Sequence, residues 1–173
     1  MKKSLVIALF ALACGTMAYA QPRSIGANLG ANFGVSYQHG FGDSNMLDVA
    51  IFCPWAAGNA YQYGGNTWGL GGIVTYDWID PFGTSVPWNE KGEWHWYMGV
   101  GGSGGIYNFN APSWFVGAAG HFGIEYDFWF PLQLSVDYRP VIGITGVSSA
   151  SATIDFDKGG LLSGISIGVR YKF

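Results

Sequence analysis

The sequence predicts an all-β protein, an antiparallel transmembrane β-barrel of eight strands. Three observations favour this fold class: apolar and polar residues alternate strictly, the alternating apolar set is bulky and aromatic, and charged residues are scarce. The 173 residues include 28 Gly, 17% are aromatic and 11% are charged. An ordinary soluble domain has about 25% charged residues and about 7% Gly. A disordered polymer is excluded, and a water-soluble globule is disfavoured.

The first 20 residues have the pattern of an export signal. Lys2 and Lys3 form a basic start, 5–13 is an apolar run, and the small residues of 18–20 precede Gln21. We therefore expect a signal peptide over 1–20, which is removed, and one domain, the barrel, over 21–173. No later segment has the 18 uninterrupted apolar residues of a transmembrane helix.

Net charge and cysteine content limit the expected binding partners and the possible disulfide bonds. Without the signal peptide, 6 basic residues face 11 acidic ones, a net charge of −5, so nucleic acid is not an expected partner. Cys53 is then the single cysteine, and no intramolecular disulfide can form. A competing interpretation makes Cys14 a lipidated N-terminus, but the leucine expected three residues earlier is missing.

Alternation with a period of two, the period of a strand, begins at Ser24 and runs to Gln38. One face of this run is apolar, from Ile25 to Tyr37, and the other holds Gly, Asn, Ser and Gln. The same pattern returns in six more segments, 47–51, 68–78, 94–100, 114–126, 132–138 and 165–173.

The volume of the side chains decides which face points outward. The lumen of a barrel of about eight strands is only wide enough to be filled by ordinary side chains. The bulky aromatic set is too large for it, whereas the opposite face is mostly Gly, Ser, Asn and Thr with isolated charges. We therefore expect the aromatic face to meet lipid and the polar face to fill the lumen. A β-sandwich core is the alternative interpretation of the aromatic strands.

Aromatic residues at the strand ends predict girdles at the two membrane interfaces. Trp68 and Trp78 are ten residues apart on one face. At about 3.3 Å per residue and a tilt near 40°, they are roughly 25 Å apart along the membrane normal, the height of the apolar band. The predicted girdle residues are Trp68, Trp78, Trp94, Trp96, Trp114 and Tyr171.

A barrel in lipid must close, because every unpaired N–H or C=O group at a strand edge costs several kcal/mol there. Bacterial single-chain barrels have an even number of strands, and only seven alternating runs are clear. We expect the long first run to divide near Gly30–Gly34. The alternative is an additional strand within Ser149–Phe156.

The hairpin over 114–144 has a predictable register. A three-residue connection, Trp129–Pro131, places Asp127 opposite Gln133 and Gly123 opposite Asp137. Arg139 then lies in the middle of the lumen. We expect its guanidinium to pair with at least one acid, Asp48, Asp77 or Glu125, because an unpaired buried charge is costly.

The polar faces together predict a structural network of charges in the lumen. Its expected members are Asp48, Asp77, His121, Glu125, Asp137, Arg139 and Arg170. A proton or ion path, or a catalytic carboxylate with histidine, is the functional alternative. No grouping of nucleophile, base and acid is evident in the sequence, so we expect structural pairing and no catalytic residues.

Two motifs that could indicate a cofactor or a metal lack the necessary context. Gly99, Gly101 and Gly104 match G-x-G-x-x-G, but no helix is expected after them, so relief of crowding in a strand is the better interpretation. His39, His95 and His121 lack metal-ligand spacing. No cofactor and no metal are predicted.

The C-terminal half resembles a family of small bacterial outer-membrane β-barrel proteins. The stretch GIEYDFWFPLQLSVDYRP and the end GVRYKF are similar to the family's PLxLSLDWRP strand and GIRYRF end, with Val136 and Tyr138 in place of Leu and Trp. FGVSYQHGFGDSN resembles the family's ELSYQHPL segment. The terminal Phe173 resembles the signal recognised by the outer-membrane assembly machinery.

The resemblance implies a location in the bacterial outer membrane, with lipids, lipopolysaccharide and the assembly machinery as partners. It implies no reaction. We therefore expect a monomeric barrel with a filled lumen and a structural or surface-interaction role, not an enzyme. A lipid-modifying barrel enzyme and a narrow pore are the alternatives, the pore being disfavoured because aqueous channels need about 16 strands.

Overall fold

The computed structural model describes residues 23–30, 33–53, 69–81, 91–107, 113–147, 153–156 and 164–173. The predicted signal peptide and Trp68 lie outside these residues. Every described element is a strand: β1 Arg23–Gly30, β2 Phe33–Gly40, β3 Asn45–Cys53, β4 Gly69–Ile79, β5 Gly92–Tyr107, β6 Ser113–Phe128, β7 Leu132–Tyr138, β8 Val141–Val147, β9 Thr153–Phe156 and β10 Ile165–Lys172. In the part of the chain described, no helix is long and apolar enough to cross a membrane.

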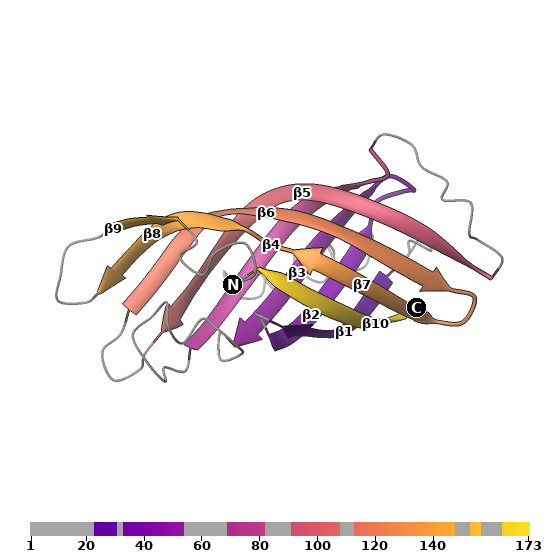
Figure 1. Ribbon diagram of the computed structural model, residues 1–173, viewed down its shortest axis with the longest axis horizontal. Coiled ribbons are helices and arrows are strands. Elements are labelled where there is room, and N and C mark those ends of the chain that lie inside the picture. Colours follow the sequence, from indigo (N-terminus) through magenta and orange to yellow (C-terminus); the bar gives the residue numbers. More distant parts are fainter. Residues whose placement is uncertain are drawn as a thin grey trace, which may run out of the picture.

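The strands form one closed antiparallel sheet (Figure 1). Each strand from β1 to β6 pairs with the next, and β10 pairs with both β7 and β1 to complete the ring. Because β7 and β8 both pair with β6, they are two parts of one barrel strand. The fold is therefore the predicted eight-stranded barrel.

The interruption of the seventh barrel strand occurs at Pro140. Proline has no N–H to donate to a ladder. Its carbonyl still accepts from the N–H of Gly120 at 2.8 Å, and the N–H of Arg139 donates to Gly164 at 3.0 Å. The two ladders thus continue past the proline on both sides of the strand.

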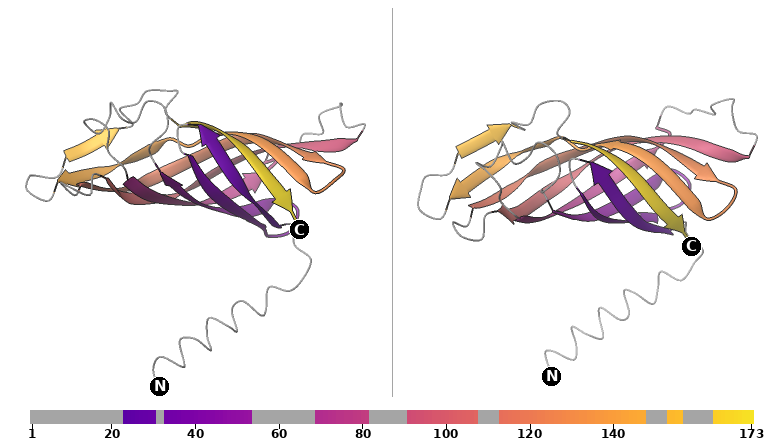
Figure 2. Two further views of the ribbon diagram at one scale, coloured as in Figure 1. Left: turned by 90° about the horizontal axis from the view of Figure 1, so that it is seen from below. Right: turned by 60° about the horizontal axis from the view of Figure 1, so that its bottom comes forward.

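Both proposals for the missing strand correspond to real elements, but only one completes the barrel. The first run divides as predicted into β1, which ends at Gly30 with a φ of 140°, and β2, which begins at Phe33. The alternative segment contains β9, which pairs with β8 and extends the sheet. Figure 2 shows β8 and β9 at one end of the molecule, beyond β1 and β10.

The outward face is apolar around the barrel. Val35, Val74, Val100 and Ile167, from four different strands, are each about half exposed in the isolated chain. Their chain neighbours on the opposite phase, such as Ser36, Thr75 and Ser166, are buried. The predicted orientation of the two faces is therefore confirmed.

The lumen has two regions that differ in chemistry. We call the end where β1 begins and β10 ends the terminal end; there the Phe173 N–H donates to the Arg23 carbonyl at 2.9 Å. Polar and charged side chains fill the middle and line the terminal part. Toward the opposite end lies an apolar core of Ala50, Phe52, Ile73, Phe115 and Ala119, with Val141 packed against it. The expectation of a polar lumen is thus wrong for the far part.

Glycines provide the space that the large inward side chains need. A Cβ on Gly71 would lie 2.6 Å from the Phe52 ring, and one on Gly123 would overlap the Tyr97 ring. A Cβ on Gly99 would overlap a carboxylate oxygen of Asp77. Gly99 is inside β5, so the G-x-G-x-x-G stretch is a crowded strand, as the sequence analysis favoured.

Candidate functional site

The polar part of the lumen is organised around Arg170, on β10. Its Nε donates to Ser36 Oγ at 2.9 Å and its Nη1 to Ser135 Oγ at 2.6 Å. Its Nη2 donates to Asn28 Oδ1 at 3.2 Å and to Asp137 Oδ2 at 3.3 Å. A fully buried guanidinium therefore connects β1, β2, β7 and β10.

Arg139 and Arg170 share a second acid, Asp48. Arg139 Nη2 lies 3.2 Å from both oxygens of Asp48, and Arg170 Nη2 lies 3.8 Å from one of them. The side chain of Arg139 reaches β3 across the lumen. The hairpin register predicted from the sequence is confirmed, because Asp127 pairs with Gln133 and Gly123 with Asp137. Asp48 is one of the three acids that the sequence analysis gave as possible partners of Arg139.

His121 connects Asp77 to Asp137. Its Nδ1 lies 3.0 Å from Asp77 Oδ2, and its Nε2 lies 3.4 Å from Asp137 Oδ1. Thr75 Oγ1 donates to Asp77 Oδ2 at 3.1 Å and lies 3.2 Å from His121 Nδ1. We call the linked set the central network; it comprises Asn28, Ser36, Asp48, Thr75, Asp77, Tyr97, His121, Ser135, Asp137, Arg139 and Arg170.

This grouping of hydroxyl, imidazole and carboxylate was not evident in the sequence. Thr75 Oγ1 lies 3.2 Å from His121 Nδ1, and Asp137 Oδ1 lies 3.4 Å from His121 Nε2, so a hydroxyl and an acid contact opposite ring nitrogens, as in a catalytic triad. All of these groups are closed off inside the barrel, however. His121 and Asp77 are fully buried, and Thr75 is 2% exposed. A substrate does not reach these atoms in this arrangement.

Tyr97 is a network member that the sequence analysis missed. Its hydroxyl donates to Asp137 Oδ1, and its ring lies 4.9 Å from that of His121. The signal was present in the sequence, because Tyr97 has the phase opposite to Trp94 and Trp96, which were predicted to face outward. It was overlooked because aromatic residues occupy both phases of the segment 94–100, so Tyr97 did not stand out as an inward residue.

Glu125 was predicted to belong to the charge network, but the structure places it elsewhere. It is 4% exposed, and its Oε2 has no hydrogen-bond partner among the described residues. Of the seven predicted members, the other six are linked to one another by the contacts above. Glu125 instead lines a cavity at the terminal end.

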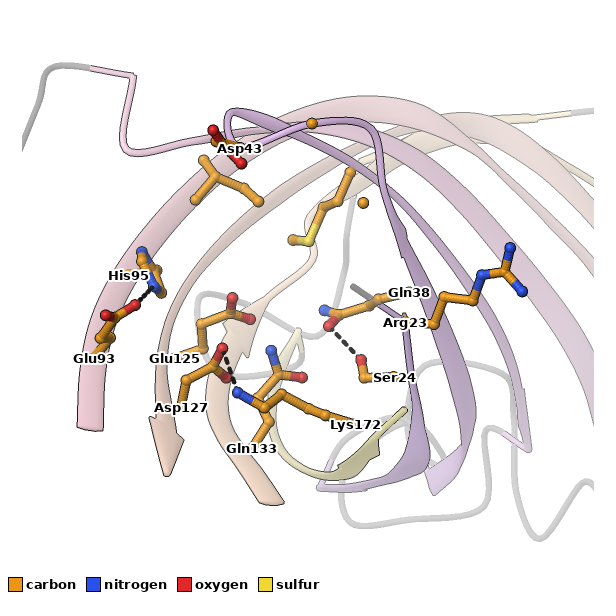
Figure 3. A pocket seen from close by; sticks show the side chains of 14 residues that line it. Arg23, Ser24, Gln38, Asp43, Glu93, His95, Glu125, Asp127, Gln133 and Lys172 are labelled. Atoms are coloured by element: carbon orange, nitrogen blue, oxygen red, sulfur yellow. Dashed lines mark hydrogen bonds and ion pairs between the residues drawn. The ribbon is translucent and has the colours of Figure 1, made fainter. Parts of the chain in front are cut away.

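This terminal-end cavity has a volume of about 370 Å³. Figure 3 shows side chains from both sides of the barrel around it, with Glu125, Asp127 and Gln133 close together. Lys172 Nζ contacts Asp127 Oδ2 at 2.9 Å, and Ser24 Oγ donates to Gln38 Oε1 at 2.9 Å. The cavity is therefore lined by charged and amide groups together with two apolar side chains, Met46 and Ile79.

His95 stands at the mouth of the same cavity. Its Nδ1 lies 2.8 Å from Asp80 Oδ2, and its Nε2 lies 3.5 Å from Glu93 Oε2. Asp80 also accepts from the Trp96 N–H at 3.1 Å, which fixes the carboxylate beside the ring. Among the described residues, no group of His, Cys, Asp or Glu is arranged to hold a metal ion.

The predicted girdle residues lie on the outer face where they are described. Trp78, Trp114 and Tyr171 are exposed, and Trp94 and Trp96 share the outward phase with partial exposure. The rings of Trp94 and Tyr126 pack against each other at an interplanar angle of 49°, with centroids 4.9 Å apart. Five of the six predicted positions can thus be placed.

Comparison with known proteins gives one match. No family model matches the chain, and no curated protein matches it. Among solved structures, the chain is similar to a major outer membrane protein from Thermus thermophilus, at 16% identity and a TM-score of 0.45. The match covers 90% of this chain and 100% of that chain. The resemblance to the family of small outer-membrane barrels stays a prediction.

Proposed function

We propose that the protein is a small outer-membrane β-barrel that acts as a membrane-anchored structural or surface-interaction protein. The observation that carries the proposal is the orientation of the two faces. A closed sheet that buries Asp48, His121 and Arg170 while exposing half of Val35, Val74 and Ile167 is inverted relative to a soluble protein. Hydrocarbon is the solvent that suits such an outer face, and closure satisfies the backbone groups there.

The filled lumen favours an anchor over a channel. Arg170, Tyr97 and His121 are among the largest fully buried side chains, and all three lie inside the barrel. The apolar core occupies the far part of the same interior. Eight-stranded barrels are only wide enough for such filling. The expected partners are outer-membrane lipids, lipopolysaccharide and, for the C-terminal strand, the assembly machinery; the expected state is a monomer.

The burial of Thr75, His121 and Asp77 also argues against a lipid-modifying enzyme that uses these groups. A general base must come within about 3 Å of the proton it removes, directly or through one water. Incubation with labelled lipopolysaccharide tests this alternative. Label transferred by the wild type and lost in His121→Asn would replace the structural role with a catalytic one.

The membrane location is tested by refolding. The mature chain is expected to fold only with detergent or lipid, and then to migrate on a gel at a position that shifts on heating. A matched sample in plain buffer is the control. A stable, monomeric β-sheet protein in that buffer would contradict the proposal.

A further inference from the structure

The terminal-end cavity contains buried polar atoms that the protein itself does not satisfy. Among the described residues, such atoms on cavity-lining side chains include four, Glu125 Oε2, Asp127 Oδ1, Gln133 Oε1 and Gln38 Nε2. Glu125, Gln133 and Gln38 are each at least 95% buried. Such groups cost free energy unless a partner is supplied, about 1–3 kcal/mol each and more for a charge.

The chemistry of these atoms indicates the kind of partner. Three of the four are oxygens that accept hydrogen bonds, and two of those belong to carboxylates. The cavity is lined by four acids, Asp43, Glu93, Glu125 and Asp127, against two permanent cations, Arg23 and Lys172. The excess of acceptors and of negative charge favours a cationic ligand that donates hydrogen bonds.

We propose that the terminal-end cavity binds an alkylammonium group. An ammonium has three N–H donors and no acceptor, which matches the three unpartnered oxygens of Glu125, Asp127 and Gln133. These three side chains lie together in Figure 3, where β6 and β7 face the cavity. The volume of about 370 Å³ is at the lower end of small-molecule sites and admits a short aliphatic amine.

Lys172 makes one ammonium–carboxylate contact at this cavity. Its ammonium already contacts the other oxygen of Asp127, at 2.9 Å. Glu125 lies two residues away on the same face of β6 and has no such cation among the described residues. A second ammonium would complete the arrangement.

The test uses the mature protein refolded in detergent micelles, so its outcome does not depend on where the protein resides. Calorimetric titration with 1,4-diaminobutane is expected to show saturable binding, and titration with butane-1,4-diol, which lacks the charge, is expected to show none. Glu125→Gln should weaken binding of the diamine about tenfold or more, because charge-assisted hydrogen bonds are the strong ones. Gln133→Leu provides a second variant that removes an acceptor without removing charge, and it should also weaken binding.

Glu93→Gln is the matched control, because it removes the same charge from the exposed mouth of the same cavity. Exposed charges are screened, so it should weaken binding by less than about threefold. Equal effects of Glu93→Gln and Glu125→Gln would overturn the proposal, as would equal binding of the diol or absence of diamine binding.

The ammonium can come from a free amine or from a lysine side chain of a macromolecule. Nα-Acetyl-lysine N-methylamide carries the same ammonium group on a side chain whose backbone is capped at both ends. Binding of this compound as tightly as the diamine would assign the site to a protein side chain, and binding of the diamine alone would assign it to a free amine.

Discussion

The central network and the apolar core occupy the same lumen, yet they are held together by opposite means. In the network, Arg170 and Arg139 reach acids on other strands, and the contacts are directional. In the core, Phe52 and Phe115 pack over glycines, and shape alone decides the fit. The comparison shows that the lumen of a narrow barrel can be filled either by paired charged side chains or by closely packed apolar ones. The two parts should respond differently to substitution.

Arg170→Met is expected to have the largest effect, in the central network. It leaves Asp137 without its cation and withdraws three further hydrogen bonds. Breaking a buried pair by removing one partner costs about 3–5 kcal/mol. The free energy of unfolding, from urea titration in lipid vesicles, measures this loss. Arg170→Lys is the control that keeps the charge but not the fork of donors, and it should recover only part of the loss.

Val74→Arg tests the outer surface of the barrel, which surrounds both parts of the lumen. A cation facing lipid at mid-depth costs about 2–4 kcal/mol, but only about 0–1 kcal/mol at the interface. Trp78→Arg, four residues along the same face of β4, is the matched control at the strand end. Equal losses of unfolding free energy for the two variants would contradict the assigned depths.

Gly71→Ala tests packing in the apolar core, with the smallest expected effect. The new Cβ would lie 2.6 Å from the Phe52 ring, so the substitution should cost about 1–3 kcal/mol of unfolding free energy. Phe52→Leu removes the nearest ring atoms, so the double variant should lose less than the two single variants combined. Strict additivity would show that the ring and the glycine are not coupled.

The orientation of each strand and the register of one hairpin could be predicted from the sequence. A period of two assigns every residue to a face, and the short turn at Trp129–Pro131 fixes which residues of β6 and β7 oppose each other. For the same reason the lumen position of Arg139 could be predicted, with a short set of possible partners.

The division of the lumen into two parts could not be predicted. Alternation assigns a residue to a face but does not give its depth relative to distant strands, which depends on the shear of the closed barrel. Phe52 and Phe115 have the inward phase, yet the sequence alone does not show that they meet. Glu125 lies four residues from His121 on β6, so its separation from His121 follows from the sequence, but its level relative to the acids on β3 and β4 does not.

Planar-bilayer conductance tests most directly the central claim that side chains seal the lumen. The refolded wild type is expected to insert without discrete conductance steps, because the central network and the apolar core both fill the interior. Insertion is verified separately by protection of the barrel from added protease. Regular, reproducible current steps from the inserted wild type would contradict the account and make the protein a pore.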